Sequence, residues 1–143
     1  MTQIKRLRRP SAGGYARGDE TRQRIIDAAI RLFGEHGFDG ASTRDIAAAA
    51  AVNAPALQYY FENKEGLYKA CAEYITEDLK TRYAPVTKHA REVLKNNADA
   101  DALIDAYLRF QAIVLDSVLG QQHVSKGLLI GRELAGDSPK IAS

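Results

Sequence analysis

Three helix-start signals lie within residues 42–63, and they leave room there for only two short helices. Ser42 opens the pattern S-T-R-D, in which its hydroxyl can accept a hydrogen bond from the Asp45 amide. Asn53 comes shortly before a proline in the first turn of the next segment, where a missing N–H costs little, and Asn63 comes directly before K-E-G-L. We therefore predict one helix from Ser42 through the alanine run Ala47–Ala51, a second at about 54–60 and a third at 64–83.

Apolar residues in the rest of the chain recur with the helical period and strand signals are absent, so we predict an all-α fold. A first helix is expected at 20–36, with Asp19 as its N-cap and Gly37 as its stop. Pro85 predicts a break, because proline removes a backbone donor and clashes with the preceding turn. Three more helices are expected at 86–96, 99–119 and 122–135. The middle one should pack inside a bundle, since its apolar residues keep helical spacing: Leu103, Ala106, Tyr107, Phe110, Val114 and Leu115.

Basic charge is concentrated at the N-terminus. The chain of 143 residues has a net charge of only +2, yet residues 1–24 hold seven basic side chains against two acidic ones, which leaves −3 for the rest. Residues 1–18 also contain one proline and three glycines, so we predict a flexible basic arm. Such an arm could be attracted to nucleic acid or acidic membrane, or it could serve only as a solubilising tail. Cys71 is the single cysteine, which fits a reducing compartment, and no apolar run could span a bilayer, so we expect a cytoplasmic protein.

A longer amphipathic helix followed by two short ones has the layout of a helix-turn-helix, whose second helix enters the DNA major groove. Leu57 and Phe61 lie four residues apart and should close the core. Small residues in the first turn would let the backbone approach base edges and touch a thymine methyl, and Gln58 could pair with an adenine edge. The predicted base-reading residues are Asn53, Ala54, Pro55, Ala56 and Gln58.

Phosphate contacts are predicted on both flanks of the short helix at 54–60. Thr43 and Arg44 open the preceding helix, where free backbone N–H groups and the helix dipole favour an anion. Lys64 repeats this arrangement at the start of the following helix. Tyr59 and Tyr60 offer hydroxyl groups at the end of the short helix.

Residues 20–75 resemble the DNA-binding region of the TetR/AcrR family of bacterial transcriptional regulators. The resemblance rests on TRQRIIDAAIRLFGEHGFDGASTRDIA and NAPALQYYFENKEGLYKA, which include the pattern L-x-Y-Y-F-x-x-K-E-x-L. The segments NAPALQYYFENKEGLY and RELAGDSP also resemble a CecR-like subgroup. The family resemblance implies base contacts by Arg44, Ala54, Pro55 and Ala56, and phosphate contacts by Thr43, Tyr59, Tyr60 and Lys64.

Two positions depart from the family pattern. Ala51 stands where the family usually has glycine, so the turn either holds an alanine in the left-handed region or takes a different shape. Gln58 replaces a frequent tyrosine, which puts one usual phosphate contact in question.

The resemblance also implies a helical ligand-binding and dimerisation domain after about residue 80, with the last two helices forming most of the dimer interface. The segment RELAGDSPKIAS resembles the middle of such a domain, which implies that this chain stops before those helices. We therefore expect a basic arm at 1–18, a helix-turn-helix domain at 19–65 and part of a ligand-binding and dimerisation domain at 66–143.

The C-terminal half could contain a ligand cavity, although an ordinary bundle core is an equal alternative for each residue. Its candidate lining combines apolar and polar side chains: Tyr107, Phe110, Gln111, Val114 and His123. The three histidines are too dispersed to predict a metal site, and Cys71 lies on an apolar helix face as a small core residue. No nucleophile with its base, phosphate-binding glycine loop or metal-ligand spacing is present, so neither an enzyme nor a cofactor is predicted.

The sequence thus predicts a transcriptional regulator, acting as a repressor, that binds a palindromic double-stranded DNA operator as a homodimer. As the resemblance implies, a small molecule in the C-terminal domain would release DNA by changing the separation of the two recognition helices. The alternative is a DNA-binding fragment or interaction protein without ligand response.

Overall fold

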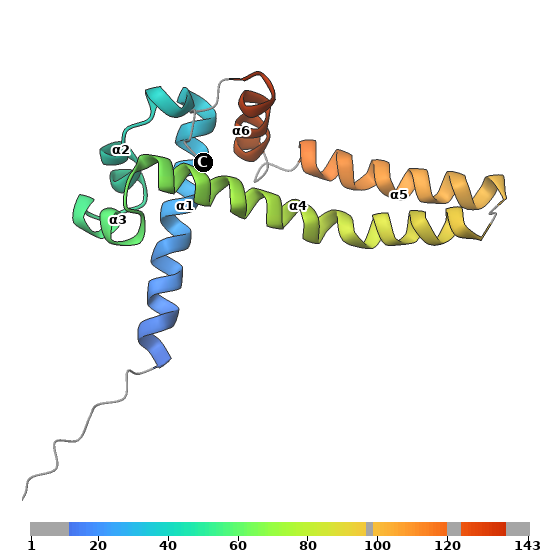
Figure 1. The fold of residues 1–143 in the computed structure, drawn as a ribbon, viewed down its shortest axis with the longest axis horizontal. Coiled ribbons are helices and arrows are strands. Elements are labelled where there is room, and N and C mark those ends of the chain that lie inside the picture. Colours follow the sequence, from blue (N-terminus) through green and yellow to red (C-terminus); the bar gives the residue numbers. More distant parts are fainter. Residues whose placement is uncertain (1–11, 97–98, 120–123, 137–143) are drawn as a thin grey trace, which may run out of the picture.

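The computed structural model describes residues 12–96, 99–119 and 124–136, which form helices and no strand (Figure 1). The all-α fold predicted from periodicity is therefore confirmed over these residues, and none of their helices is long and apolar enough to cross a membrane. The helices are α1 (Ala12–Gly40), α2 (Thr43–Ala49), α3 (Ala54–Tyr60), α4 (Lys64–Lys95), α5 (Ala100–Leu119) and α6 (Val124–Leu134).

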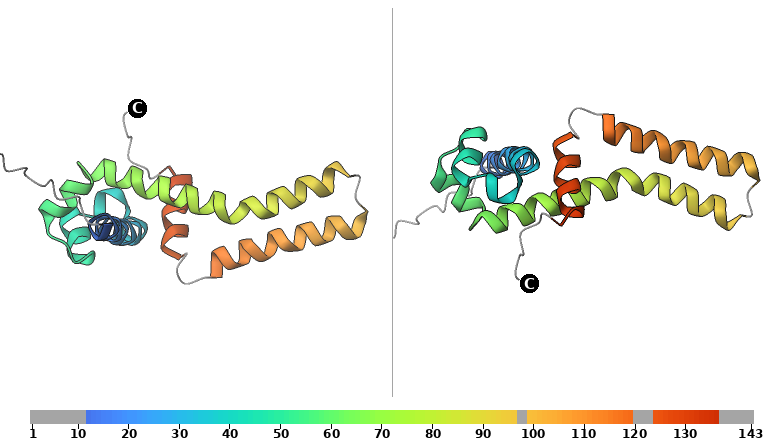
Figure 2. Two further views of the ribbon diagram at one scale, coloured as in Figure 1. Left: turned by 90° about the horizontal axis from the view of Figure 1, so that it is seen from below. Right: turned by 90° about the horizontal axis from the view of Figure 1, so that it is seen from above.

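Helices α1 to α3 and the start of α4, through Ile75, pack around one core and are called the headpiece below. The rest of α4 pairs with α5 as a hairpin that points away from the headpiece, and α6 lies across α1 between the two (Figures 1 and 2). Because α4 runs without interruption from the headpiece into the hairpin, one rigid element joins the two parts of the chain.

The three predicted caps are confirmed. The Asp45 amide donates to Ser42 Oγ at 3.0 Å, the Ala56 amide to Asn53 Oδ1 at 2.8 Å, and the Gly66 amide to Asn63 Oδ1 at 2.7 Å. Each bond satisfies a backbone donor that a helix start would otherwise leave without an acceptor. These caps set the starts of α2, α3 and α4 where the sequence placed them.

Helix α1 is longer than predicted at its N-terminal end. It begins at Ala12, so Asp19 lies inside the helix and caps nothing, and residues 12–18 of the predicted flexible arm are helical. Glycine costs only about 1 kcal/mol per helical position, and adding residues to a formed helix is much easier than nucleating one. Residues 1–11 lie outside the described part of the chain. At the other end, Gly37 takes φ 75° and ψ 174°, so the predicted stop of the regular helix is confirmed.

The break predicted at Pro85 is wrong. Helix α4 continues through Pro85 to Lys95, and Figure 2 shows it bending along its length. A proline inside a helix loses one backbone hydrogen bond and usually kinks the helix without having to end it when tertiary contacts hold both sides. Here Val86, the next residue, is buried, and Thr87 Oγ1 donates to the Tyr83 and Ala84 carbonyls at 3.0 Å.

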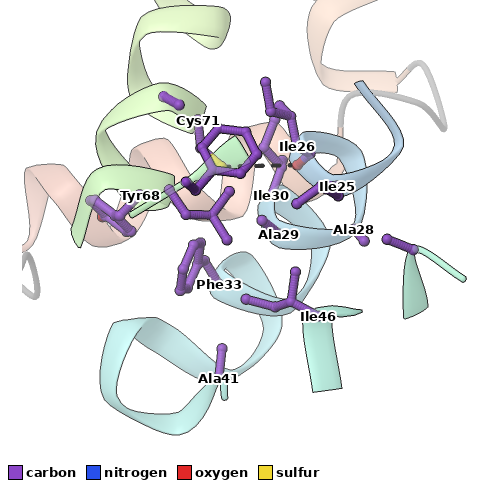
Figure 3. Close-up of a cluster of buried hydrophobic side chains, with 14 of the residues drawn as sticks. Ile25, Ile26, Ala28, Ala29, Ile30, Phe33, Ala41, Ile46, Tyr68 and Cys71 are labelled. Carbon is purple, nitrogen blue, oxygen red and sulfur yellow. Dashed lines mark hydrogen bonds between the residues drawn. The ribbon is translucent and has the colours of Figure 1, made fainter. Parts of the chain in front are cut away.

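The headpiece core is built around fully buried side chains of α1, α2 and α4 (Figure 3). Three aromatic rings close one end of it: Tyr68 meets Phe33 at 5.1 Å and Phe38 at 5.3 Å between ring centroids, edge to face in both cases. Each large side chain buried in this way contributes about 1.5–3 kcal/mol. The largest fully buried residues are Phe33, Ile25, Ile26, Ile46, Leu67 and Cys71.

Helix α6 is fastened to the end of α1. Arg132 donates from Nε to the Gly34 carbonyl at 2.9 Å and from Nη2 to the Glu35 carbonyl at 3.1 Å. These carbonyls belong to the last turns before the Gly37 kink, where a cation complements the helix dipole. The two backbones cross closely, because a Cβ at Gly34 would lie 2.8 Å from the Ser125 carbonyl oxygen.

The prediction that α5 packs inside a bundle is wrong for the described chain. Among the apolar positions named above for it, Ala106 is buried, whereas Leu103, Phe110 and Tyr107 are 44%, 42% and 59% exposed. The reason is that α4 covers only one side of α5. The helical spacing of its apolar residues correctly predicted that α5 is amphipathic, but this spacing does not indicate which element covers the apolar side.

Candidate nucleic-acid interface

The turn between α2 and α3 holds its alanine in the left-handed region. Ala51 has φ 53°, which is the first of the two alternatives left open by the sequence. The Val52 amide donates to the Ala47 carbonyl at 2.9 Å and the Ala51 amide to the Ala48 carbonyl at 3.1 Å. This pair of bonds is the Schellman arrangement that usually ends a helix on glycine. The turn therefore keeps the geometry that glycine normally provides and fixes the angle at which α3 leaves α2.

Helix α3 presents its first turn to solvent. Leu57 and Phe61 are 4% and 5% exposed and anchor the helix in the core, as predicted. Asn53 uses Oδ1 for the cap, so its amide nitrogen remains the group that can donate outward. The rest of the predicted base-reading set faces away from the core: Ala54, Pro55 and Gln58 are exposed, and Ala56 is half-buried.

Helix α2 contacts α3 and begins with two of the predicted phosphate-binding residues. Thr43 is half-buried and Arg44 is exposed. Their backbone amides belong to the first turn, which has no intrahelical acceptors for them, so an anion could be bound there. Asp45 lies in the same turn, with its carboxylate accepting from the Ser42 hydroxyl, and its negative charge partly opposes that anion. Arg44 therefore supplies the side-chain charge at this flank.

Lys64, on the other flank, is positioned by an aromatic ring. Its Nζ lies 4.5 Å from the centroid of the Phe38 ring, a cation–π distance. Sequence reasoning missed Phe38 as its partner, because the two residues are far apart in the chain and no local pattern links them. The ring holds the ammonium group near the start of α4, next to the Asn63 cap.

The two tyrosines differ in environment. Tyr59 is 84% exposed, whereas Tyr60 is half-buried against the core and its hydroxyl lies 3.7 Å from where a Cβ of Gly18 would be. The rings meet edge to face at 5.3 Å. Sequence reasoning also missed Arg22 of α1, whose guanidinium lies 5.3 Å from the Phe61 ring centroid at the end of α3. The sequence feature that could have indicated a role for Arg22 was its position in the basic segment 1–24.

The predicted ligand-pocket residues lie on an open surface. Tyr107 and Phe110 are exposed on α5, Val114 is half-buried, and Gln111 Nε2 donates to Tyr107 Oη at 2.7 Å. His123 lies outside the described residues. The structure brings the first four together along one helix without enclosing them, so the pocket stays a prediction.

Two of the cavities among the described residues lie close to the headpiece core. One of about 240 Å³ between α4 and α6 is mainly apolar, and Glu133 at its edge accepts a hydrogen bond from the Tyr68 hydroxyl. A wider groove of about 700 Å³ lies where α1, the end of α2, α4 and α6 meet, and Arg24, Arg31 and Lys126 contribute to its walls. The lining of the smaller cavity is Tyr68, Ala72, Ile75, Thr76, Leu79, Leu129, Ile130, Glu133 and Leu134.

Cys71 is a core residue. Burial, with a smaller contribution from the Asp27 carboxylate, raises the pKa of its thiol to about 12, and its Sγ lies 3.9 Å from the Ile26 carbonyl oxygen (Figure 3). A thiol in this environment stays protonated and unreactive. Across the described ranges, no cluster of three His, Cys, Asp or Glu side chains could hold a metal ion.

Comparison with known proteins places this geometry in a family. Residues 25–71 match the family model described as bacterial regulatory proteins, tetR family. The HTH-type transcriptional dual regulator CecR of Shigella flexneri is 32% identical over 118 residues, which cover 82% of this chain and 52% of CecR. The probable HTH-type transcriptional regulator YttP of Bacillus subtilis is 30% identical over 123 residues, 85% of this chain and 54% of YttP.

A third relative matches over a shorter length. The biofilm operon icaADBC HTH-type negative transcriptional regulator IcaR of Staphylococcus aureus is 38% identical over 58 residues, 38% of this chain and 31% of IcaR. The chain thus spans about half the length of CecR and YttP and less of IcaR. The matched residues include the capped α2, the Ala51 turn and α3, and the similarity to CecR agrees with the subgroup resemblance seen in the sequence. Residues 25–71 of this chain therefore form a domain of the tetR family of bacterial regulatory proteins.

Proposed function

We propose that this protein is a DNA-binding transcriptional regulator that acts as a repressor in the cytoplasm. The observation that carries the proposal is the exposed first turn of α3, held by the Asn53 cap and the Ala51 turn and flanked by the starts of α2 and α4. These three elements lie at the end of the molecule opposite the hairpin, where a duplex can approach them without meeting α5 or α6 (Figure 1).

In this proposal α3 enters the major groove and its first turn reads the bases. Ala54, Pro55 and Ala56 are small enough to bring the backbone close to base edges, and Gln58 can make a two-point contact with adenine. Thr43, Arg44 and Lys64 bind phosphate on the two flanks. Of the two tyrosines, Tyr59 has the freer hydroxyl, because that of Tyr60 lies against α1. Further contacts can come from Arg22 beside Phe61.

The operator is proposed to be palindromic and to be bound by a homodimer. One headpiece offers a single short recognition helix, which covers only a few base pairs. Two copies related by a two-fold axis would place their recognition helices in successive major grooves, with half-sites roughly 34–36 Å apart. Specific affinity would then come from both half-sites together.

The repressor is further proposed to respond to a small molecule. A ligand can shift DNA binding only by its differential affinity for two arrangements of the protein, so its site must touch an element that moves with the headpiece. The cavity between α4 and α6 meets this condition, because α6 is hydrogen-bonded through Arg132 to a backbone carbonyl of α1, a helix of the headpiece. The residues predicted on α5 would form a second part of such a site if another element covers them. A DNA-binding protein without ligand response is the alternative.

A salt titration with single substitutions tests the DNA contacts. Lys64→Ala should weaken binding to all sequences and reduce the slope of log affinity against log salt by about 0.9, the value for one phosphate contact. Ala56→Ser should leave the slope unchanged and alter the sequences recovered in a selection from genomic fragments. Lys88→Ala, an exposed lysine in the hairpin, is the matched control and should change neither quantity. An unchanged slope for Lys64→Ala would reject its phosphate role.

A further inference from the structure

The groove of about 700 Å³ between the headpiece and α6 combines positive walls with an apolar floor. Its basic residues are Arg24 and Arg31 of α1 and Lys126 of α6, and Asp27 is the one acidic residue among the described residues that line it. Three positive charges therefore face one negative charge, although residues 25–143 carry −3 in total. The positive charge in the groove is local, because the body of the protein is mildly acidic.

The two arginines lie on the same side of α1. They are seven residues apart, which is two helical turns or about 10 Å, so both guanidinium groups can contact one small molecule that lies along the groove. Both side chains are exposed, and the ion pairs formed among the described residues involve neither Arg24 nor Arg31. A guanidinium group binds carboxylate or phosphate through two parallel N–H bonds. The two arginines therefore provide donors suited to an oxyanion.

Lys126 is held in the wall of the groove by two contacts. Its Nζ donates to Asp78 Oδ2 at 3.0 Å and lies 4.9 Å from the centroid of the Tyr74 ring. An ammonium group has three N–H donors, so the bond to Asp78 leaves donors for a ligand. The Asp27 carboxylate accepts a hydrogen bond from Gln23 Nε2 at 2.8 Å. Its negative charge opposes an anion in the groove, so removing that charge should strengthen anion binding.

Small apolar residues form the floor of the groove, and one of them is strained. Ala28, Ile30 and Ala50 are buried there, and Ala51 lines the groove beside them. Among the described residues, Ala51 is the one non-glycine residue with a positive φ, 53°, a conformation that glycine adopts without strain. Strained backbone of this kind clusters at functional sites. The methyl group of Ala51, at a position where glycine would relieve the strain, enlarges the apolar floor.

We propose that this groove binds a small organic anion with a flat apolar body. Arg24, Arg31 and Lys126 bind its carboxylate or phosphate group, and its apolar body lies on the alanine methyl groups, including that of Ala51. Alanine side chains do not project far, so the floor they form suits a flat body. The volume of the groove lies within the ~300–1,000 Å³ of small-molecule sites. This site shares no lining residue with the cavity between α4 and α6.

A molecule in this groove contacts α1, the turn between α2 and α3, and α6 at the same time. The turn fixes the angle at which α3 leaves α2, through the bonds of Val52 and Ala51 to the carbonyls of α2. The bound anion therefore favours one position of α6 relative to the recognition helix. This effect on α3 rests on the proposed function, whereas binding in the groove does not.

Isothermal titration calorimetry of the purified 143-residue chain, without DNA, tests the site. The probes are phenyl phosphate and benzoate, which join an anionic group to a flat ring, inorganic phosphate, which lacks the ring, and benzyl alcohol, which lacks the charge. At least one of the two ring-bearing anions should bind at one site per chain, and the other two probes roughly 10-fold or more weakly. The tighter of the two anions shows whether the groove prefers phosphate or carboxylate. The proposal is overturned if neither binds, or if a probe without the ring or without the charge binds as tightly.

Substitutions in the groove test the role of each residue with the tighter probe. Arg31→Gln should weaken binding about 10- to 100-fold, because it removes a charged hydrogen-bond donor, and Asp27→Asn should strengthen binding. Ala51→Gly should weaken binding about fourfold, the value of one buried methyl group, in a protein that still folds. Arg91→Gln is the matched control, since it makes the same change as Arg31→Gln at an exposed arginine of α4 outside the groove. Unchanged binding by Arg31→Gln would overturn the proposed site.

Binding to duplex fragments recovered by selection separates this site from the proposed function. A saturating concentration of the tighter probe should change the affinity of the wild type for duplex about fivefold or more, and Arg31→Gln should lose this response. If the probe binds but the chain binds no duplex, the repressor proposal fails and the site stands. If the chain binds duplex but none of the probes, the site fails and DNA binding stands. If both bind without influencing each other, the effect on α3 is refuted.

Discussion

Replacing Ala51 with glycine should stabilise the protein. The φ of 53° at this position costs an alanine about 1–2 kcal/mol, because its Cβ crowds the following carbonyl, whereas glycine has no Cβ and is free of this cost. Glycine also increases the conformational entropy of the unfolded chain, which offsets about 0.4–1 kcal/mol of this gain in stability. The Ala51 side chain is exposed, so removing its methyl group uncovers little of the core. The net expectation is a gain of about 0.5–1 kcal/mol in the free energy of unfolding.

The assay is denaturant unfolding at one fixed protein concentration, since association would otherwise contribute to the measured stability. Ala51→Gly should raise the midpoint without changing the slope against denaturant. Ala48→Gly is the matched control, because Ala48 is also an exposed alanine but lies inside α2, where glycine should destabilise by about 0.5–1 kcal/mol. If both substitutions lowered the midpoint, the left-handed conformation of Ala51 would be refuted.

Three further substitutions probe the packing and the charges. Gly34→Ala should lower the unfolding free energy by about 1–3 kcal/mol, because the new Cβ would lie 2.8 Å from a backbone carbonyl oxygen of α6; equal or greater stability would refute the tight crossing. Burial raises the pKa of the Cys71 thiol from 9.0 to about 12, so the thiol loses its proton at a lower pH in the unfolded chain than in the native state. The free energy of unfolding should therefore fall as pH rises through this window, and Cys71→Ala should lack this part of the pH dependence. Burial alone would raise the pKa of Asp78, but the hydrogen bond and charge of Lys126, with Arg82, lower it overall. Asp78→Asn should therefore cost most stability at neutral pH, and the loss should shrink as acid protonates the wild-type carboxylate. A loss that did not change with pH in denaturant unfolding would contradict this.

Features that depend on neighbours in the chain could be predicted from the sequence. Ser42, Asn53 and Asn63 each accept a hydrogen bond from an amide three residues later. Donor and acceptor lie in the same four-residue segment, so the residue types in that segment are enough to predict the bond. The same holds for the strain at Ala51, where a Cβ sits in a turn that glycine usually occupies. The predicted start of α1 was wrong. The glycines of residues 12–18 lower helix propensity, but a helix that has already formed after them can extend toward the N-terminus.

Features that depend on distant partners could not be predicted. Nothing beside Lys64 in the sequence indicates that its ammonium group lies over the Phe38 ring. Pro85 was read as a break because its local cost is certain, whereas the contacts of Val86 that keep α4 continuous come from elsewhere in the fold. Helical spacing marked the apolar face of α5, but the same spacing is produced by a buried core, a ligand pocket and an interface. Only the three-dimensional arrangement distinguishes these, through the exposure of Tyr107 and its neighbours.

Tyr68 connects the α6 side of the molecule to the proposed DNA interface. Its hydroxyl donates to Glu133 of α6 at the edge of the 240 Å³ cavity, and its ring meets Phe38 edge to face at 5.3 Å. Phe38 follows directly after the Gly37 kink and lies under the Lys64 ammonium group at 4.5 Å. Contacts of these kinds contribute about 0.5–1.5 kcal/mol each, enough to bias the position of one lysine but too little to move the headpiece as a body. A ligand that displaced Tyr68 from Glu133 would therefore act first on a single phosphate contact, and a larger effect on DNA binding would require it to shift α6 against α1 as well.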